Sequence, residues 1–158
     1  MGTGTTVKDF HAVQAKLKLI YPQIERQLKQ RALSASKELR NVELEVLRGK
    51  RSGKMYIKPG TGRVKYNKKN KTASITYKTY QASAPGEPPG VRTNTLRSSF
   101  RPVIAGSYGA AIESGVKYAH YLQNGTSKMA QRPIIEPIAE KAKPAVENIY
   151  CQPFKINI

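Results

Sequence analysis

The sequence has few of the residues on which catalytic, metal-binding or disulfide-stabilised proteins depend. Its 158 residues include one cysteine, two histidines and no tryptophan. A single cysteine, Cys151, excludes a disulfide framework within the chain, and two histidines without paired cysteines make a poor zinc site. Glu113 and His120 are a conceivable acid–base pair, but a surface pair without a catalytic role is the simpler interpretation. We therefore expect no enzymatic activity and no cofactor.

Long apolar segments are also missing. No run approaches the roughly 18 apolar residues of a membrane span, and the first residues do not resemble the apolar centre of a signal peptide. These absences predict a protein of a reducing cytosol that makes no membrane contact. The length suits a single domain, 1–158, which can bury roughly 68–70% of its unfolded surface.

Acidic residues are scarce, and this scarcity is the strongest compositional signal. The chain has 28 Lys and Arg against 10 Asp and Glu, a net charge of +18 and a pI near 10.2. Such a charge indicates an anionic partner, and composition alone does not choose among nucleic acid, an acidic protein surface and a membrane face. Eleven of the basic residues fall within 48–78, where no acidic residue occurs. The candidate contacts with DNA or an acidic partner are Arg48, Lys50, Arg51, Lys54, Lys58, Arg63, Lys65, Lys68, Lys69 and Lys71.

Apolar spacing predicts helices at both ends of the chain. Residues 7–20 carry an apolar face at intervals of three and four, Pro22 is expected to interrupt it, and a second helix is expected over 22–47. A further long helix is expected over 134–150. We expect a small antiparallel sheet to pack against these helices.

The region between the helices has the residues of strands and turns. Residues 55–58 and 73–80 favour strands, whereas the segments 59–62 and 67–71 are rich in turn residues. We expect a long β-hairpin with a basic, mobile tip. Tyr56, Tyr66, Tyr77 and Tyr80 lie among its charges and could stack on exposed bases.

The remaining segment begins with a proline-rich stretch, 84–90, that must cross the surface in an extended conformation. A short helix capped by Thr93 or Thr95 and holding Leu96 and Phe100 should follow. Strands are expected at 102–105 and 110–115, and a helical turn at 118–123. The predicted fold class is α+β, a small antiparallel sheet packed against long N- and C-terminal helices with a protruding basic β-hairpin. Its parts are a helical region (7–47), the basic hairpin (48–80), an extended arm and sheet (81–133), the C-terminal helix (134–150) and a tail (151–158).

Several short motifs between residues 53 and 137 occur in a distinctive order. They are Gly53 with Tyr56, Ala82-Ser83-Ala84-Pro85-Gly86-Glu87 with Pro89, Thr93 with Leu96, Ser98 and Ser99, Tyr118-Ala119-His120-Tyr121-Leu122 with Gly125-Thr126, and Arg132-Pro133 with Pro137. This order resembles the small head–tail joining, or tail-completion, proteins of the neck of long-tailed bacteriophages. Three positions depart from the family pattern. Asn94 replaces a glycine but tolerates a left-handed turn, Gln123 replaces a glutamate, and Ile134 replaces an aromatic residue.

The resemblance implies a structural virion protein of the phage neck, located at the head–tail junction and in the host cytoplasm during assembly. It implies a homo-oligomeric ring around the DNA channel, six-fold or twelve-fold, whose partners are neighbouring neck proteins, proteins at the end of the tail tube and the genomic DNA. The candidate subunit contacts are Pro85, Gly86, Glu87, Pro88, Pro89 and Arg132.

Three alternatives stay open at this point. The basic hairpin could face channel DNA or an acidic neighbouring ring. The proline-rich arm could be a rigid internal crossover, although we favour an interface between subunits. The chain as a whole could instead be a general nucleic-acid-binding protein that uses the same basic hairpin.

Overall fold

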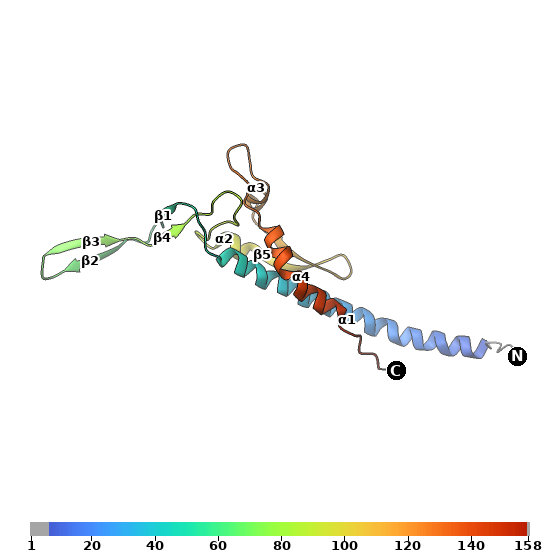
Figure 1. Ribbon diagram of the computed structural model, residues 1–158. Coiled ribbons are helices and arrows are strands. Elements are labelled where there is room, and N and C mark those ends of the chain that lie inside the picture. Colours follow the sequence, from blue (N-terminus) through green and yellow to red (C-terminus); the bar gives the residue numbers. More distant parts are fainter. Residues whose placement is uncertain (1–6, 158) are drawn as a thin grey trace.

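The computed structural model describes residues 7–157, and its longest element is helix α1 (Val7–Arg48), with 42 residues (Figure 1). The prediction of two helices separated at Pro22 is wrong, because α1 continues through this residue. A proline inside a helix leaves the carbonyl of residue i−4, here Lys18, without its hydrogen bond. Both residues are exposed. Water can therefore bond to this carbonyl, and the helix continues.

The body of the molecule forms around the second half of α1. Strands β5 (Phe100–Ala105) and β6 (Gly109–Ser114) pair antiparallel and pack on α1, and α4 (Ile135–Cys151) packs on the same helix. The expected strands and C-terminal helix are thus confirmed to within a few residues. The buried cluster consists of Val42, Leu47, Phe100, Ile134, Ile138 and Ala142.

Two short helices connect these elements. The first, α2 (Thr95–Ser99), has Asn94 as its N-cap, so the predicted cap at Thr93 or Thr95 is wrong and Thr95 is instead the first residue of the helix. Asn94 has a φ of 67°, the left-handed conformation that asparagine tolerates. The prediction that α2 holds Phe100 is wrong, since this residue starts β5 and is 8% exposed. An extended conformation at Phe100 directs its ring into the core. The second, α3 (Tyr118–Asn124), matches the predicted helical turn to within one residue and is followed by Gly125 at φ 74°, a conformation that favours glycine.

The tail after α4 is attached along α1 by side chains of that helix. Gln27 bonds both backbone groups of Lys155, at 2.6 and 3.0 Å, and Gln23 bonds both backbone groups of Asn157, at 2.9 and 3.1 Å. Arg31 donates to the carbonyls of Tyr150 and Pro153. One turn of helix separates the two glutamines, so they match alternate residues of the extended tail.

A buried ion pair lies further along α1. The Glu43 side chain is fully buried and forms an ion pair with Arg40, which also donates to the Arg97 carbonyl at 2.7 Å. Burial, and to a smaller degree the nearby Arg97 charge, lower the pKa of Arg40. Through Arg40, the pair connects the C-terminal part of α1 to the segment that contains α2.

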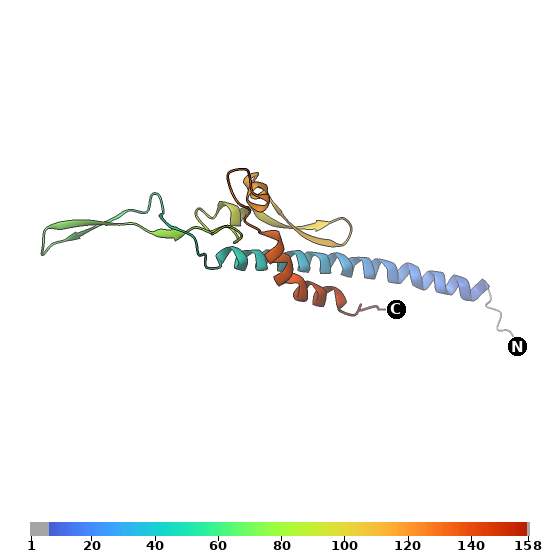
Figure 2. The ribbon, with the colours of Figure 1, turned by 45° about the horizontal axis from the view of Figure 1, so that its top comes forward.

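A thin β-ribbon extends from the C-terminal end of α1 and points away from the body (Figures 1 and 2). Its inner ladder pairs β1 (Met55–Ile57) with β4 (Thr79–Gln81), and its outer ladder pairs β2 (Arg63–Asn67) with β3 (Thr72–Thr76). The strands thus form three separate antiparallel pairs rather than one small sheet. The α+β class and the protruding basic hairpin are confirmed.

No helix in the described part of the chain is both long and apolar enough to cross a membrane.

Candidate interaction surfaces

The ribbon is interrupted between its two ladders. Five residues, 58–62, face only two, Tyr77 and Lys78, so the predicted strand 73–80 is in fact two strands. The Thr61 hydroxyl accepts a hydrogen bond from the Lys78 amide at 3.1 Å and donates to the Lys58 carbonyl at 2.6 Å. This side chain replaces the lost ladder contacts. The interruption separates an inner ladder near the body from an outer ladder, 63–76, which we call the outer ribbon.

The outer ribbon has two chemically different faces. Residues paired across an antiparallel ladder project to the same face, and faces alternate along each strand. One face therefore combines the pairs Val64–Ile75 and Tyr66–Ala73, and is wholly apolar. The opposite face combines the pairs Arg63–Thr76, Lys65–Ser74 and Asn67–Thr72, and is polar and basic.

The apolar face continues one pair towards the body. An added Cβ at Gly62 would lie 3.0 Å from the Tyr77 ring and 3.6 Å from Ile75. A glycine at this position lets the tyrosine ring cover the backbone. The apolar face thus runs from Tyr77 to Ala73 without a charged residue.

The tip of the ribbon adds charge to the basic face. Residues 68–71 form the turn, with Lys71 at φ 47° and the Lys69 amide donating to Asn67 Oδ1 at 3.1 Å. The five outer basic residues are Arg63, Lys65, Lys68, Lys69 and Lys71. All of them are exposed. This end of the ribbon can neutralise phosphates or carboxylates without reading a base sequence.

The other predicted basic contacts lie nearer the body, and Arg51 is engaged within the chain. Its guanidinium donates to the carbonyls of Val46 at 2.7 Å, Leu47 at 3.3 Å and Pro89 at 3.2 Å. It caps the C-terminus of α1, and burial lowers its pKa. The four residues Arg48, Lys50, Lys54 and Lys58 carry the charge from the end of α1 to the interruption.

The tyrosines are not arranged among the lysines in the way expected from the sequence. Tyr66 and Tyr77 belong to the apolar face, opposite Lys65. Tyr56 and Tyr80 stack on each other with ring centroids 5.8 Å apart. Base stacking and phosphate contact would therefore use opposite faces of the outer ribbon.

The proline-rich arm, 84–90, is fastened to the base of the ribbon. Glu87 accepts hydrogen bonds from the Ser52 hydroxyl at 2.6 Å, the Ser52 amide at 3.1 Å and the Ala84 amide at 3.0 Å. These bonds lower the pKa of Glu87 to about 2, the Ser52 hydroxyl making the largest contribution. Pro89 is buried, whereas Pro85 and Gly86 are exposed and Pro88 is half-buried. The arm is an internal crossover whose outer edge is available to a neighbour.

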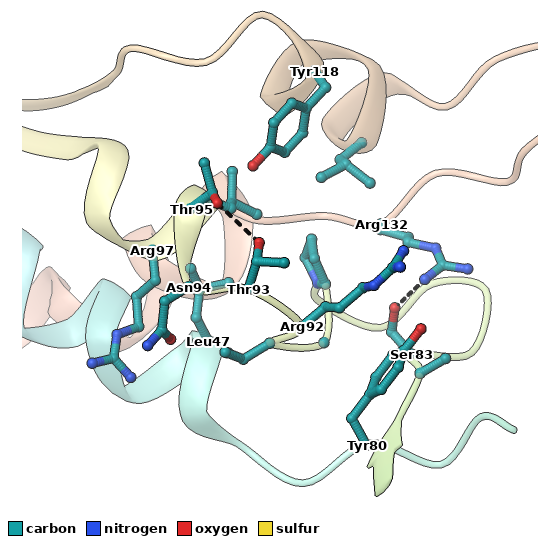
Figure 3. Close-up of a pocket in the computed structure, with 16 residues that line it drawn as sticks. Leu47, Tyr80, Ser83, Arg92, Thr93, Asn94, Thr95, Arg97, Tyr118 and Arg132 are labelled. Atoms are coloured by element: carbon teal, nitrogen blue, oxygen red, sulfur yellow. Dashed lines mark hydrogen bonds between the residues drawn. The ribbon is translucent and has the colours of Figure 1, made fainter. Parts of the chain in front are cut away.

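A cavity of about 550 Å³ lies between this arm, the end of α1, α2 and α3 (Figure 3). Arg132, a predicted contact, donates to Ser83 at its wall. Arg92 and Arg97 also line the cavity, and no lining residue is acidic. Leu47, Leu96 and Leu122 supply apolar surface, so the cavity is suited to a carboxylate carried on an apolar segment.

Two groups of residues in these surfaces were missed from the sequence. The apolar face could have been found from the alternation Arg63-Val64-Lys65-Tyr66, which has the period of a strand. No local pattern indicates that Arg92 and Arg97 line the same cavity as Arg132, because this arrangement depends on the crossover of the arm.

Gln123 has a clear role where the family pattern has glutamate. Its Oε1 accepts the Ile134 amide at 2.7 Å and the Ile135 amide at 3.1 Å, while its Nε2 donates to Glu136. It caps the N-terminus of α4, and its hydrogen bond lowers the pKa of Glu136.

Among residues 7–157, no group of three or more His, Cys, Asp and Glu side chains is arranged to hold a metal ion. In comparisons with protein-family models, curated protein sequences and solved structures, none matches this chain.

Proposed function

We propose that this protein is a structural component of a bacteriophage neck that joins or completes the head–tail junction as a ring around the DNA channel. It acts there through surfaces rather than through catalysis. The order of motifs from Gly53 to Pro137 supports this proposal, because together they resemble the joining proteins. The partners are other copies of the chain, neighbouring neck and tail-tube-end proteins, and the DNA that passes through the channel.

One observation carries the proposal furthest: a small body holds a thin ribbon at a distance from itself, and this ribbon has a basic face and an apolar face. Every strand residue of the outer ribbon is exposed, on both faces. Such a ribbon suits a protein that contacts a neighbour on one side and a polyanion on the other. The cavity near Arg132 offers a further contact for an acidic segment of an adjacent protein.

Charge reversal at the ribbon tip tests the proposal. The variant Lys68→Glu, Lys69→Glu and Lys71→Glu should reduce the yield of joined particles in the phage that encodes this chain, while the circular dichroism spectrum stays unchanged. The matched control replaces Lys37, Lys117 and Lys128, which are exposed on the body, with glutamate. Both variants change the net charge equally. Normal yield from the tip variant, or equal loss in the two, would contradict a role for the ribbon in joining.

The basic surface also supports a second candidate, a general nucleic-acid-binding protein. A general binder should hold DNA tightly as an isolated monomer, with an affinity that falls steeply as salt is added. A connector should bind DNA weakly alone and be found in the particle. Titrating labelled duplex DNA at several salt concentrations separates the two functions.

A further inference from the structure

The apolar face of the outer ribbon has no partner in the described part of the chain. Val64 is 68% exposed, Tyr66 61% and Ile75 56%. A two-stranded ribbon is only marginally stable in water unless it packs on something. An acidic partner or DNA would bind the opposite face, since the apolar one presents no charge. We therefore expect the apolar face to bind an apolar surface.

A second apolar surface without a partner lies at the other end of the molecule. Phe10, Val13 and Leu17 recur at intervals of three and four on the first turns of α1, and they are 55–63% exposed. At 100° per residue, Phe10 and Leu17 lie within about 40° of Ala35 and Val42 around the helix. Ala35 and Val42 are buried in the body. The face of α1 that packs on the body thus continues beyond it, uncovered.

The two surfaces agree in length and lie at opposite ends. The five residues of β2 span about 16 Å. The stretch from Phe10 to Ile20 spans about 15 Å along the helix. Figures 1 and 2 both show the ribbon and the start of α1 extending from the body in opposite directions. A symmetric contact between two ribbons would leave the helix face exposed, and a contact between two helices would leave the ribbon exposed. A contact between the ribbon of one copy and the helix of another covers both.

We propose that the apolar face of the outer ribbon docks on the Phe10–Ile20 face of α1 in a second copy of this chain. Such a contact joins two different surfaces, so it can repeat from subunit to subunit and close into a ring where the rotation allows, whereas a reciprocal pair would stop at the dimer. In this contact Arg63 and Lys65 lie on the opposite face of the ribbon, so they remain exposed and can bind an anion. The proposal rests on the proposed ring function and names the surfaces that would form the ring.

Cysteine cross-linking tests the contact directly. In a Cys151→Ser background, which removes the one native and exposed cysteine, Val64→Cys and Leu17→Cys are combined in one chain. Mild oxidation of the purified protein over a concentration series should give a ladder of covalent multimers beyond the dimer. The matched control pairs Leu17→Cys with Lys65→Cys, which lies on the opposite face of β2, and it should give little cross-linking.

The single-cysteine variants exclude the symmetric alternatives. Efficient dimers from Val64→Cys alone would show a ribbon-to-ribbon contact, and dimers from Leu17→Cys alone would show a helix-to-helix contact. Either result overturns the proposal. A double variant that stays monomeric at every concentration, in high salt and with added DNA, overturns it as well.

A pair of neighbouring substitutions provides a second readout. Ile75→Asp places a carboxylate in the proposed joint, and Ser74→Asp places the same group on the opposite face. Ile75→Asp should weaken self-association by about tenfold or more, because an unpaired charge would be buried. Ser74→Asp should leave it unchanged or strengthen it. Sedimentation velocity measures both, and equal effects would contradict the contact.

The salt dependence of self-association provides an independent test. Copies that each carry a charge of +18 repel one another, so screening should strengthen their association. DNA binding responds in the opposite direction, because added salt weakens it.

The cross-link test and the particle-yield test can also fail separately. If the chain is required for joined particles but gives no cross-linked ladder, the proposed contact is wrong and the proposed function stands. If the chain gives a ladder but is absent from particles, the contact stands and the proposed function is wrong.

Discussion

The hairpin β5–β6 and the outer ribbon β2–β3 are both two-stranded and antiparallel and both contain apolar residues, but only β5–β6 packs against a helix. In β5–β6, Phe100 is 8% exposed and Ile112 packs against the core, because α1 lies against this hairpin. In the outer ribbon every strand residue is exposed. A two-stranded hairpin with apolar residues therefore contributes to the core in one place and is exposed to solvent in the other. The presence of a neighbouring helix makes the difference.

Replacing one aromatic residue in each hairpin with alanine should give the largest difference in the free energy of unfolding between the two regions. Phe100→Ala should lower the free energy of unfolding by about 3–5 kcal/mol, since it opens a cavity in the core. Tyr66→Ala in the outer ribbon should change it by less than about 0.5 kcal/mol in the isolated chain. Urea denaturation measures both. A large effect from Tyr66→Ala in the monomer would mean that the ribbon packs on its own body.

The tail offers an intermediate case, a segment that lies on α1 through polar contacts. Arg31 donates to Tyr150 O at 3.0 Å and to Pro153 O at 2.9 Å, and its guanidinium lies 4.1 Å from the centroid of the Phe154 ring. Arg31→Ala should cost about 2 kcal/mol and release the tail. Faster hydrogen exchange at the Lys155 and Asn157 amides would report the release.

Arg26→Ala is the control for this prediction, because Arg26 is exposed on the same helix. Unchanged exchange in Arg31→Ala, or equal acceleration in the two variants, would show that the glutamines alone hold the tail.

The smallest effect should come from the arm and should depend on pH. The folded chain lowers the pKa of Glu87 from 4.5 to about 2, so its ionised form is favoured on folding. The attachment of the arm to Ser52 is therefore complete above about pH 4.5 and is lost as the pH falls towards 2. At neutral pH, Glu87→Gln should loosen the arm, whereas below pH 2 the variant and the wild type should behave alike.

Limited proteolysis of residues 84–90 at neutral pH, and amide exchange across the pH range, measure this attachment. Glu113→Gln, on the exposed side of β6, is the matched control. A difference between Glu87→Gln and wild type that persists unchanged below pH 2 would contradict the assignment to this carboxylate.

Local sequence patterns predicted most of the helices and strands but not all of their first and last residues. The two strands of the body, the C-terminal helix and the helical turn near residue 118 follow from spacing and turn chemistry. The break predicted at Pro22 failed because an exposed helix can leave one carbonyl to water. The strand predicted over 73–80 was divided because its partner strand has three more residues at the interruption, and strand pairing is a long-range property.

The surfaces were predicted less completely than the elements. The basic charge of residues 48–71 is visible in the sequence, but its segregation to one face depends on the register between β2 and β3. Arg51 counts as a free positive charge in the sequence and is a helix cap in the fold. Glu87 and Gln123 acquire their roles only from the segments that cross near them.

The sequence by itself determined the α+β class, the helical ends, the basic hairpin and the absence of a disulfide framework, since these depend on composition and on neighbours within a few residues. Tertiary structure alone decided that β5–β6 packs on α1 and the outer ribbon does not. It also decided that three arginines line one cavity, and that the apolar face of α1 continues uncovered past the body. These features depend on contacts between residues far apart in the chain, and local preference does not specify which elements will meet.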